Sequence, residues 1–141
     1  MAGEAQATTI RAEVKALSRN ARFTSAPRRA LLLRYLVEEE LSGRGEGIKE
    51  AVIAAELFGI ADYNTQSQSI VRAEMRRLRL ALLEHYSELA DTPLVTISIP
   101  KGSYRPQFTM PKPPTVPAPA AGYRWIAIGV LALASAMGTW M

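Results

Sequence analysis

The chain has no cysteine and only one histidine among its 141 residues. The absence of cysteine excludes a disulfide framework and thiolate metal sites. The single histidine, His85, leaves no second imidazole for a zinc cluster or a Ser/His/Asp arrangement. The sequence also lacks a glycine-rich phosphate loop and a convergent acid and base pair. We therefore predict a protein that is not an enzyme, that holds no metal or cofactor, and in which His85 is structural.

The excess of positive charge is small, so its placement matters more than its sum. Seventeen Lys+Arg against thirteen Asp+Glu give a formal charge of +4. Residues 10–29 carry only Glu13 as an acid, beside a set of basic residues made up of Arg11, Lys15, Arg19, Arg22, Arg28 and Arg29. Such a surplus suits anionic lipid as well as DNA, and the sequence leaves both open.

The C-terminal segment is the longest apolar run in the chain. Residues 125–141 contain no charge, and the span of 123–141, interrupted by Arg124, approaches the ~20 residues that cross a bilayer. Trp125 and Trp140 lie at its ends, where such rings favour the headgroup layer. We predict a transmembrane helix over 123–141 rather than a buried core helix. Basic residues before it place the N-terminal domain in the cytoplasm, and we expect a fragment of a longer protein rather than a tail anchor.

Small residues within the predicted membrane helix are spaced four apart. The pairs Ala132/Ala136 and Ala134/Gly138 are of the kind that packs two such helices, and they are compatible with a homodimer. Upstream, residues 106–122 hold six of the nine prolines. We predict a Pro/Ala-rich, semi-rigid linker over 109–122 and a folded domain over 8–108.

Three amphipathic helices open the predicted domain. The first follows a cap at Thr8/Thr9 and buries a stripe made up of Ile10, Val14, Leu17 and Ala21. The second starts at an N-cap, Ser25, with Pro27 in its first turn, ends at Gly43 and Gly45, and buries Leu32, Leu33, Leu36, Val37 and Leu41. We interpret its acidic run, Glu38–Glu40, as a solvated face. The third, over 48–59, points Ile48, Val52, Ala55 and Phe58 inward and closes at Gly59.

A long helix and a hairpin complete the domain. Residues 69–86 place Val71, Met75, Leu78, Leu82 and either His85 or Tyr86 on one buried stripe. Residues 94–99 then alternate Val95, Ile97 and Ile99 on one face of a strand, and a turn at 100–103 leads to a short return strand over 104–108. The predicted fold is mainly α with a C-terminal β-hairpin, the plan of a winged helix-turn-helix domain.

Four arginines lie within eight positions on the outward side of the long helix. Arg72, Arg76 and Arg79 share the side that also holds Ser69 and Ala73, with Arg77 on its flank. The helix alone is equally compatible with a solvated face paired to Glu74 and with a surface that binds anions. Its N-terminal half offers Gln66, Ser67, Gln68, Ser69 and Arg72 to base edges and phosphates. Lys101 and Arg105 add positive charge on the hairpin, which favours a duplex with two phosphate strands.

The order of these motifs resembles a known family. The run from "ELFG" through a polar loop, the helix core Val71, Met75, Arg77, Leu78, Arg79 and Leu82, and the "GSYR" wing looks like the winged-helix effector domain of OmpR/PhoB-type transcription regulators. The resemblance covers about residues 48–108. With a proline-rich linker and one membrane helix, the chain is similar to ToxR/CadC-like membrane-anchored activators. The run from 32 to 59 also looks like a winged-helix module that heads longer bacterial membrane proteins.

The resemblance implies a function and a set of contact residues. Base or phosphate contact would fall to Ser69, Arg72, Ala73, Arg76, Arg77 and Arg79, and backbone or minor-groove contact to the wing around Lys101. The chain departs from the family in lacking the sheet before its first helix. It also departs at four positions where the family usually has other residues, namely Arg72, Glu74, Pro100 and Ser103. We expect a single-pass regulator of the bacterial inner membrane that binds double-stranded DNA. The alternative is a winged-helix module that binds a protein in a membrane signalling complex.

Overall fold

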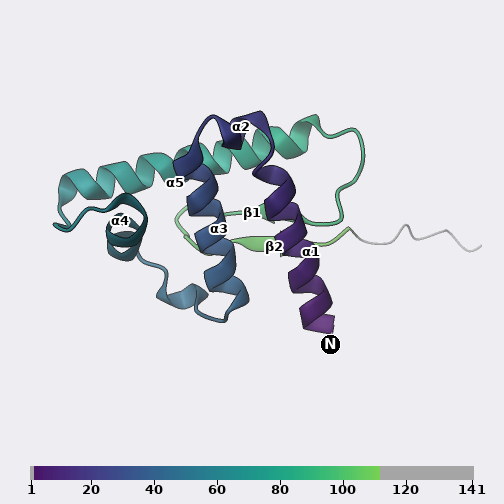
Figure 1. Cartoon of the computed structure of the whole chain (residues 1–141), viewed down its shortest axis with the longest axis horizontal. Helices are drawn as coiled ribbons and strands as arrows, with labels where there is room; N and C mark the ends of the chain where they lie inside the picture. The colour runs from purple at the N-terminus through teal and green to yellow at the C-terminus, as the bar shows by residue number, and fades with distance from the viewer. Residues whose placement is uncertain (1, 112–141) are drawn as a thin grey trace, which may run out of the picture. The chain divides into compact units, whose positions relative to one another are not determined.

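Five α-helices and one β-hairpin make up residues 2–111, the part of the chain that the computed structural model describes (Figure 1). The elements are α1 (Ala2–Leu17), α2 (Ala21–Thr24), α3 (Pro27–Leu41), a 3₁₀ turn η1 (Gly45–Gly47), α4 (Glu50–Phe58), α5 (Thr65–Glu88), β1 (Thr96–Ser98) and β2 (Gln107–Thr109). This mainly helical fold with a C-terminal hairpin confirms the predicted class at that level.

The predicted membrane helix over 123–141 lies outside the described residues, as does most of the predicted linker. Within residues 2–111, none of the helices is both long enough and apolar enough to cross a bilayer. Residues 1–111 form one compact unit with a hydrophobic core of its own. We therefore expect this unit to fold without the segment that follows.

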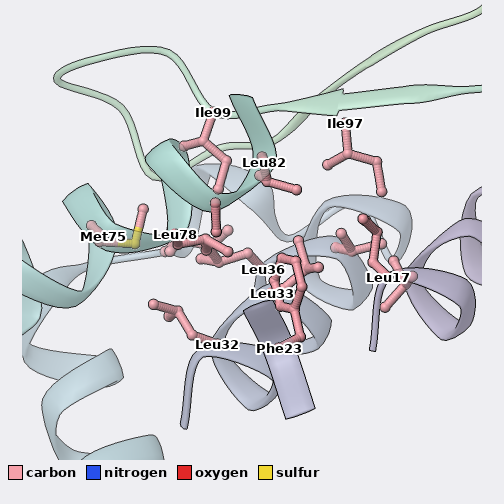
Figure 2. Close-up of a cluster of buried hydrophobic side chains, with 14 of the residues drawn as sticks. Leu17, Phe23, Leu32, Leu33, Leu36, Met75, Leu78, Leu82, Ile97 and Ile99 are labelled. Carbon is pink, nitrogen blue, oxygen red and sulfur yellow. The ribbon is translucent and has the colours of Figure 1, made fainter. Parts of the chain in front are cut away.

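One hydrophobic core joins all the helices to the hairpin. Figure 2 shows Leu17 of α1, Phe23 of α2, Leu33 of α3, Leu82 of α5 and Ile97 of β1 pointing into a common cluster. The predicted stripes of α3 and α5 are buried as expected, apart from half-buried positions at Leu41, His85 and Tyr86. Alternate residues Val95, Ile97 and Ile99 are also buried, which confirms the period-2 prediction for the first strand.

The hairpin pairs β1 and β2 antiparallel, with Ile97 opposite Phe108. Its return strand begins at Gln107, so the strand predicted over 104–108 was placed too early. Residues 104–106 are instead irregular, and the side chains of Tyr104 and Arg105 bond to the helices. Gly102 adopts φ +83°, a left-handed value that a glycine accepts without strain, and this allows the tight turn after Lys101.

Several predicted helix ends were wrong. α1 begins at Ala2, and the hydroxyls of Thr8 and Thr9 donate to the carbonyls of Glu4 and Ala5 within the helix instead of capping it. Ala21 is exposed, because the chain turns after Leu17 and starts α2 there.

The caps of the next helices also differ from the prediction. Ser25 ends α2, where its hydroxyl donates to the Ala21 carbonyl, and Ala26 takes the N-cap position of α3. Of the predicted inward residues, Ile48 is buried just before α4, Val52 and Phe58 are half-buried, and Ala55 is exposed. The fully buried residues within α4 are instead Ile53 and Ala54. Gly59 closes α4 at φ 65°, as predicted.

The acidic run at the end of α3 is not a solvated face. Each of its carboxylates pairs with an arginine from another segment: Glu38 with Arg11, Glu39 with Arg44, and Glu40 with Arg105. The sequence did not show this because the partners are up to 65 residues away. α3 therefore acts as an attachment point for α1, for the loop that follows α3, and for the hairpin.

Candidate nucleic-acid interface

The first turn of α5 is fixed by a reciprocal cap. The Asn64 side chain accepts a hydrogen bond from the Ser67 N–H at 3.0 Å, and the Ser67 hydroxyl accepts one from the Asn64 N–H at 2.7 Å. This arrangement satisfies two backbone donors that a helix start otherwise leaves unpaired. Ser67 is only 2% exposed. We therefore remove Ser67 from the predicted contact residues, since its hydroxyl is occupied in the cap and faces inward.

Six of the predicted contact residues line one surface groove. It lies between the outward side of α5 and the hairpin turn, and its lining residues are Ser69, Arg72, Ala73, Arg76, Arg79 and Lys101. The first five follow from one face of a helix at 3.6 residues per turn, whereas Lys101 is brought in by the hairpin. The fold thus joins two basic segments that are more than 20 residues apart in the sequence.

Three cations of this groove make no ion pair within the described residues, and one of them, Arg79, is half-buried and donates to the Ser103 carbonyl. Arg76 and Lys101 are exposed and have no carboxylate within ion-pair distance in residues 2–111. Arg72, by contrast, donates from Nε to Glu50 at 2.8 Å. Arg77 lies outside the groove and donates to Glu74 at 2.6 Å, three positions earlier on the same helix. The positive charge available to a ligand is therefore concentrated at Arg76 and Lys101.

Glu50, the first residue of α4, accepts hydrogen bonds from three side chains. Arg72 Nε and the Tyr63 hydroxyl both donate at 2.8 Å, and the Tyr104 hydroxyl donates as well. Burial raises the pKa of the Glu50 carboxyl, but the hydrogen bonds from Arg72, Tyr104 and Tyr63 outweigh burial and lower that pKa below its usual 4.5. Burial, followed by the bond to Glu50, raises the pKa of Tyr104 to about 12. At neutral pH this cluster therefore holds an ionised carboxylate and a protonated phenol.

Three consecutive hairpin residues attach to three different helices. The Ser103 carbonyl accepts from Arg79 Nη2 of α5 at 2.8 Å, and the Tyr104 hydroxyl donates to Glu50 of α4. Arg105 donates from Nε and Nη2 to both carboxylate oxygens of Glu40 in α3, at 2.9 and 2.8 Å. These contacts explain why residues 104–106 leave the strand ladder. They also fix where the turn presents Lys101.

Arg105 is consequently less available to a ligand than the sequence predicts. Arg105 holds the pKa of the Glu40 carboxyl below its usual range, chiefly through its hydrogen bonds and with burial opposing them. A second carboxylate, Glu46, lies 3.7 Å from its Nη1. Gly45 makes room for this pair, since a Cβ there would lie 1.7 Å from Glu40 Oε2. Arg105 therefore positions the hairpin more than it adds to the basic groove.

Sequence reasoning did not find Glu40, Glu50 or Tyr104. Each sits in a pattern with an ordinary local explanation: the end of a helix, the first turn of a helix and a strand, respectively. Their convergence depends on contacts between α3, α4 and the hairpin that are 54 and 65 positions apart. No local periodicity reports such contacts.

Within the described residues, no group of three or more His, Asp or Glu side chains is placed to hold a metal ion. Comparisons of the chain with protein-family models, with curated proteins and with solved structures found no match. The inference of function therefore depends on the geometry of the groove and on the order of the elements that build it.

Proposed function

We propose that residues 2–111 form a winged helix-turn-helix module that binds duplex DNA. In this arrangement α4 and α5 are the helix-turn-helix, α5 enters the major groove, and the β1–β2 hairpin is the wing. The observation that carries the proposal is the single groove shared by α5 and the hairpin turn, with Arg76 and Lys101 on its two sides. A helix of 24 residues with an exposed basic side is long enough to lie along the groove of a duplex.

The charges of the groove support contact with phosphate on both sides of α5. Arg76 belongs to the helix and Lys101 to the hairpin, so a duplex that receives α5 brings its two strands towards different cations. Ser69 and Ala73 are small, and they let the helix approach base edges closely. Arg72 and Arg79 are already bonded to Glu50 and to the Ser103 carbonyl, so they orient the groove while keeping their remaining donors for a ligand.

A salt titration of DNA binding tests this function. We expect residues 1–111 to bind a mixed-sequence duplex with log K falling against log salt at a slope of about −2 to −4, at ~0.9 per phosphate contact. The variant Arg76→Ala/Lys101→Ala should lower affinity and reduce the magnitude of the slope by about 2. The matched control, Lys15→Ala/Arg19→Ala, removes one lysine and one arginine from the N-terminal basic stretch and should leave both values unchanged.

The same pair of variants separates DNA binding from the alternatives. No duplex binding at low salt would refute the proposal and leave the protein-interaction module as the better hypothesis. A loss of affinity in the Lys15→Ala/Arg19→Ala control equal to that in the groove variant would place the DNA elsewhere on the domain. Attachment to a membrane through residues 123–141 belongs to this proposal as well. Fractionation of the full chain with bacterial membranes, and its release on removal of residues 112–141, would support it.

A further inference from the structure

A second hollow lies on the N-terminal part of the domain, and DNA binding does not use it. It is formed by the end of α1, by α2 and by the first half of α3, and its lining residues are Ser18, Phe23, Thr24, Pro27, Ala30, Leu31 and Arg34. None of these residues lines the groove between α5 and the hairpin. The lining is mostly apolar, and Leu31 is 45% exposed at its surface. An apolar hollow with one large exposed side chain is typical of a surface that receives another side chain.

The segment that lines this hollow carries charge of one sign. Residues 18–34, which supply the whole lining, contain five arginines and no acidic residue. Arg22 is held by Glu84 and Glu88 of α5, and Arg29 donates to the Arg22 carbonyl. The other three, Arg19, Arg28 and Arg34, are exposed and pair with no carboxylate within residues 2–111. Arg28 lies over the Phe58 ring, while Arg34 lines the hollow itself.

We propose that this hollow is a docking site for an acidic segment of a partner protein that presents a large apolar side chain. The apolar side chain would pack on Pro27, Ala30 and Leu31, and carboxylates beside it would pair with Arg34 and Arg19. Charge complementarity selects this occupant: Arg34 lines the hollow, and Arg19 follows the lining residue Ser18 in the chain. Neither arginine pairs with a carboxylate within residues 2–111, and no carboxylate belongs to the lining. Guanidinium groups also bind carboxylates in a bidentate manner, which adds orientation to attraction.

The concave shape favours a peptide over the two other anionic surfaces. A membrane surface is met by protruding side chains, whereas Phe23, at the base of this hollow, is fully buried. A DNA duplex offers phosphates but no apolar side chain to fill the hollow. The segment of this chain over 123–141 is apolar but has no acidic residue, so it lacks the charge that the rim selects. The N-terminal helices α1 and α2 thereby gain a role beyond packing on α3 and α5.

The test measures binding of a labelled synthetic peptide to the full chain in neutral detergent micelles by fluorescence anisotropy. The probe is a 15-residue helical peptide, about four turns, with leucine and phenylalanine on one face and glutamate elsewhere. A peptide with the same apolar face and lysine in place of glutamate is the control ligand. We expect the acidic peptide to bind and the lysine peptide not to bind.

Two variants locate the site, and each has a matched control. Arg34→Glu and Leu31→Glu should each weaken peptide binding roughly tenfold or more, as expected at the centre of an interface. Lys49→Glu makes the same change of charge outside the hollow, and Leu89→Glu changes another exposed leucine; neither should alter peptide binding. All four positions are exposed, so the variants should keep the far-ultraviolet circular dichroism of the parent.

Separate outcomes would overturn the inference. These are the absence of binding by the acidic peptide, equal weakening by Arg34→Glu and Lys49→Glu, or retention of peptide binding when Leu31 is replaced. A further outcome would assign the surface to lipid instead. In that case the parent would bind micelles doped with phosphatidylglycerol but not the peptide, and Arg34→Glu would abolish the binding of the micelles. Affinity for DNA should be unchanged in Leu31→Glu, so failure here is distinguishable from failure of the proposed DNA function.

Discussion

The hydroxyl group of Tyr86 connects α5, to which it belongs, with α1 and β1. Its hydroxyl donates to Glu13 of α1 at 2.9 Å and accepts from the Ile97 N–H of β1 at 3.2 Å. Ile97 is fully buried, so its N–H has no access to water. Replacing Tyr86 with phenylalanine keeps the ring and removes only this hydroxyl. The buried N–H is then left unpaired, while Glu13, which is half-buried, can still be hydrated.

The expected cost follows from the unpaired donor. An unsatisfied buried polar group costs about 1–3 kcal/mol, so we expect Tyr86→Phe to lower the free energy of unfolding by about 2 kcal/mol. For a domain near 110 residues this corresponds to a fall in Tm of roughly 8 °C. Urea unfolding of residues 1–111, followed by circular dichroism, measures the change. The matched control is Tyr35→Phe, because the Tyr35 hydroxyl makes no hydrogen bond within the described residues and the same chemical change should cost little.

The same substitution should also change the response to alkaline pH. Burial, followed by the contact with Glu13, raises the pKa of the Tyr86 phenol above its usual 10.0. Below pH 10 both the folded and the unfolded chain keep this proton, so the full contribution of the hydroxyl to the free energy of unfolding is present. Above pH 10 the unfolded chain releases the proton first and stability falls. The difference between the parent and Tyr86→Phe should therefore narrow above pH 10. Equal stability of Tyr86→Phe and Tyr35→Phe at pH 7 would refute the reasoning.

Three further changes test the contacts around the groove. Gly45→Ala places a Cβ against the Glu40 carboxylate and should lower the free energy of unfolding by about 1 kcal/mol, because it breaks the pair between Glu40 and Arg105. A Cβ at Gly47 would meet nothing within 4 Å, so Gly47→Ala should not have this effect. Urea unfolding compares the two variants, and equal effects would contradict the steric explanation. Glu50→Gln should release Arg72 and strengthen duplex binding severalfold, with a steeper salt slope by about 1; weaker binding in an anisotropy titration would show that Glu50 orients Arg72 for DNA. Because the pKa of Glu50 is lowered in the folded chain, the contribution of its carboxylate to the free energy of unfolding is present above pH 4.5 and is lost as the pH falls through the folded pKa. The parent should therefore be more stable than Glu50→Gln above pH 4.5, and urea unfolding should show this difference disappearing at lower pH; a difference that does not change with pH would contradict the reasoning.

The elements that could be predicted from the sequence are those built on local periodicity. The four residues Val71, Met75, Leu78 and Leu82, predicted at helical spacing, are buried in α5. The alternate residues Val95, Ile97 and Ile99 are buried in and beside β1. α4 is too short and too apolar for its pattern to fix an inward face, so the predicted Ala55 is exposed while Ile53 and Ala54 are buried. Helix starts were least predictable, since Thr8, Ser25 and Asn64 are all suitable caps and only Asn64 is used as one.

The candidate groove was predictable in part for the same reason. The arginine face of α5 follows from spacing alone, and the nearness of Lys101 follows from the helix–hairpin order. The pairing of Arg72 with Glu50 and of Arg105 with Glu40 was not visible, because these partners come from other helices. Pairing with Glu74 was one of the two alternatives for the arginine face, and Arg77 makes that pair. The sequence therefore overstated how many cations the surface offers. Arg76 and Lys101 remained as the principal ones only when the tertiary contacts were known.

The attachment of Ser103, Tyr104 and Arg105 to α5, α4 and α3 has a thermodynamic consequence for any ligand of the hairpin. A loop that becomes ordered on binding loses conformational entropy, about 0.5–1.5 kcal/mol for each immobilised side chain, and its complex is weaker by that amount. Here the turn that carries Lys101 is already ordered by three helices before a ligand arrives. Association should then involve little coupled folding, and its heat-capacity change should report only the surface buried between the two molecules.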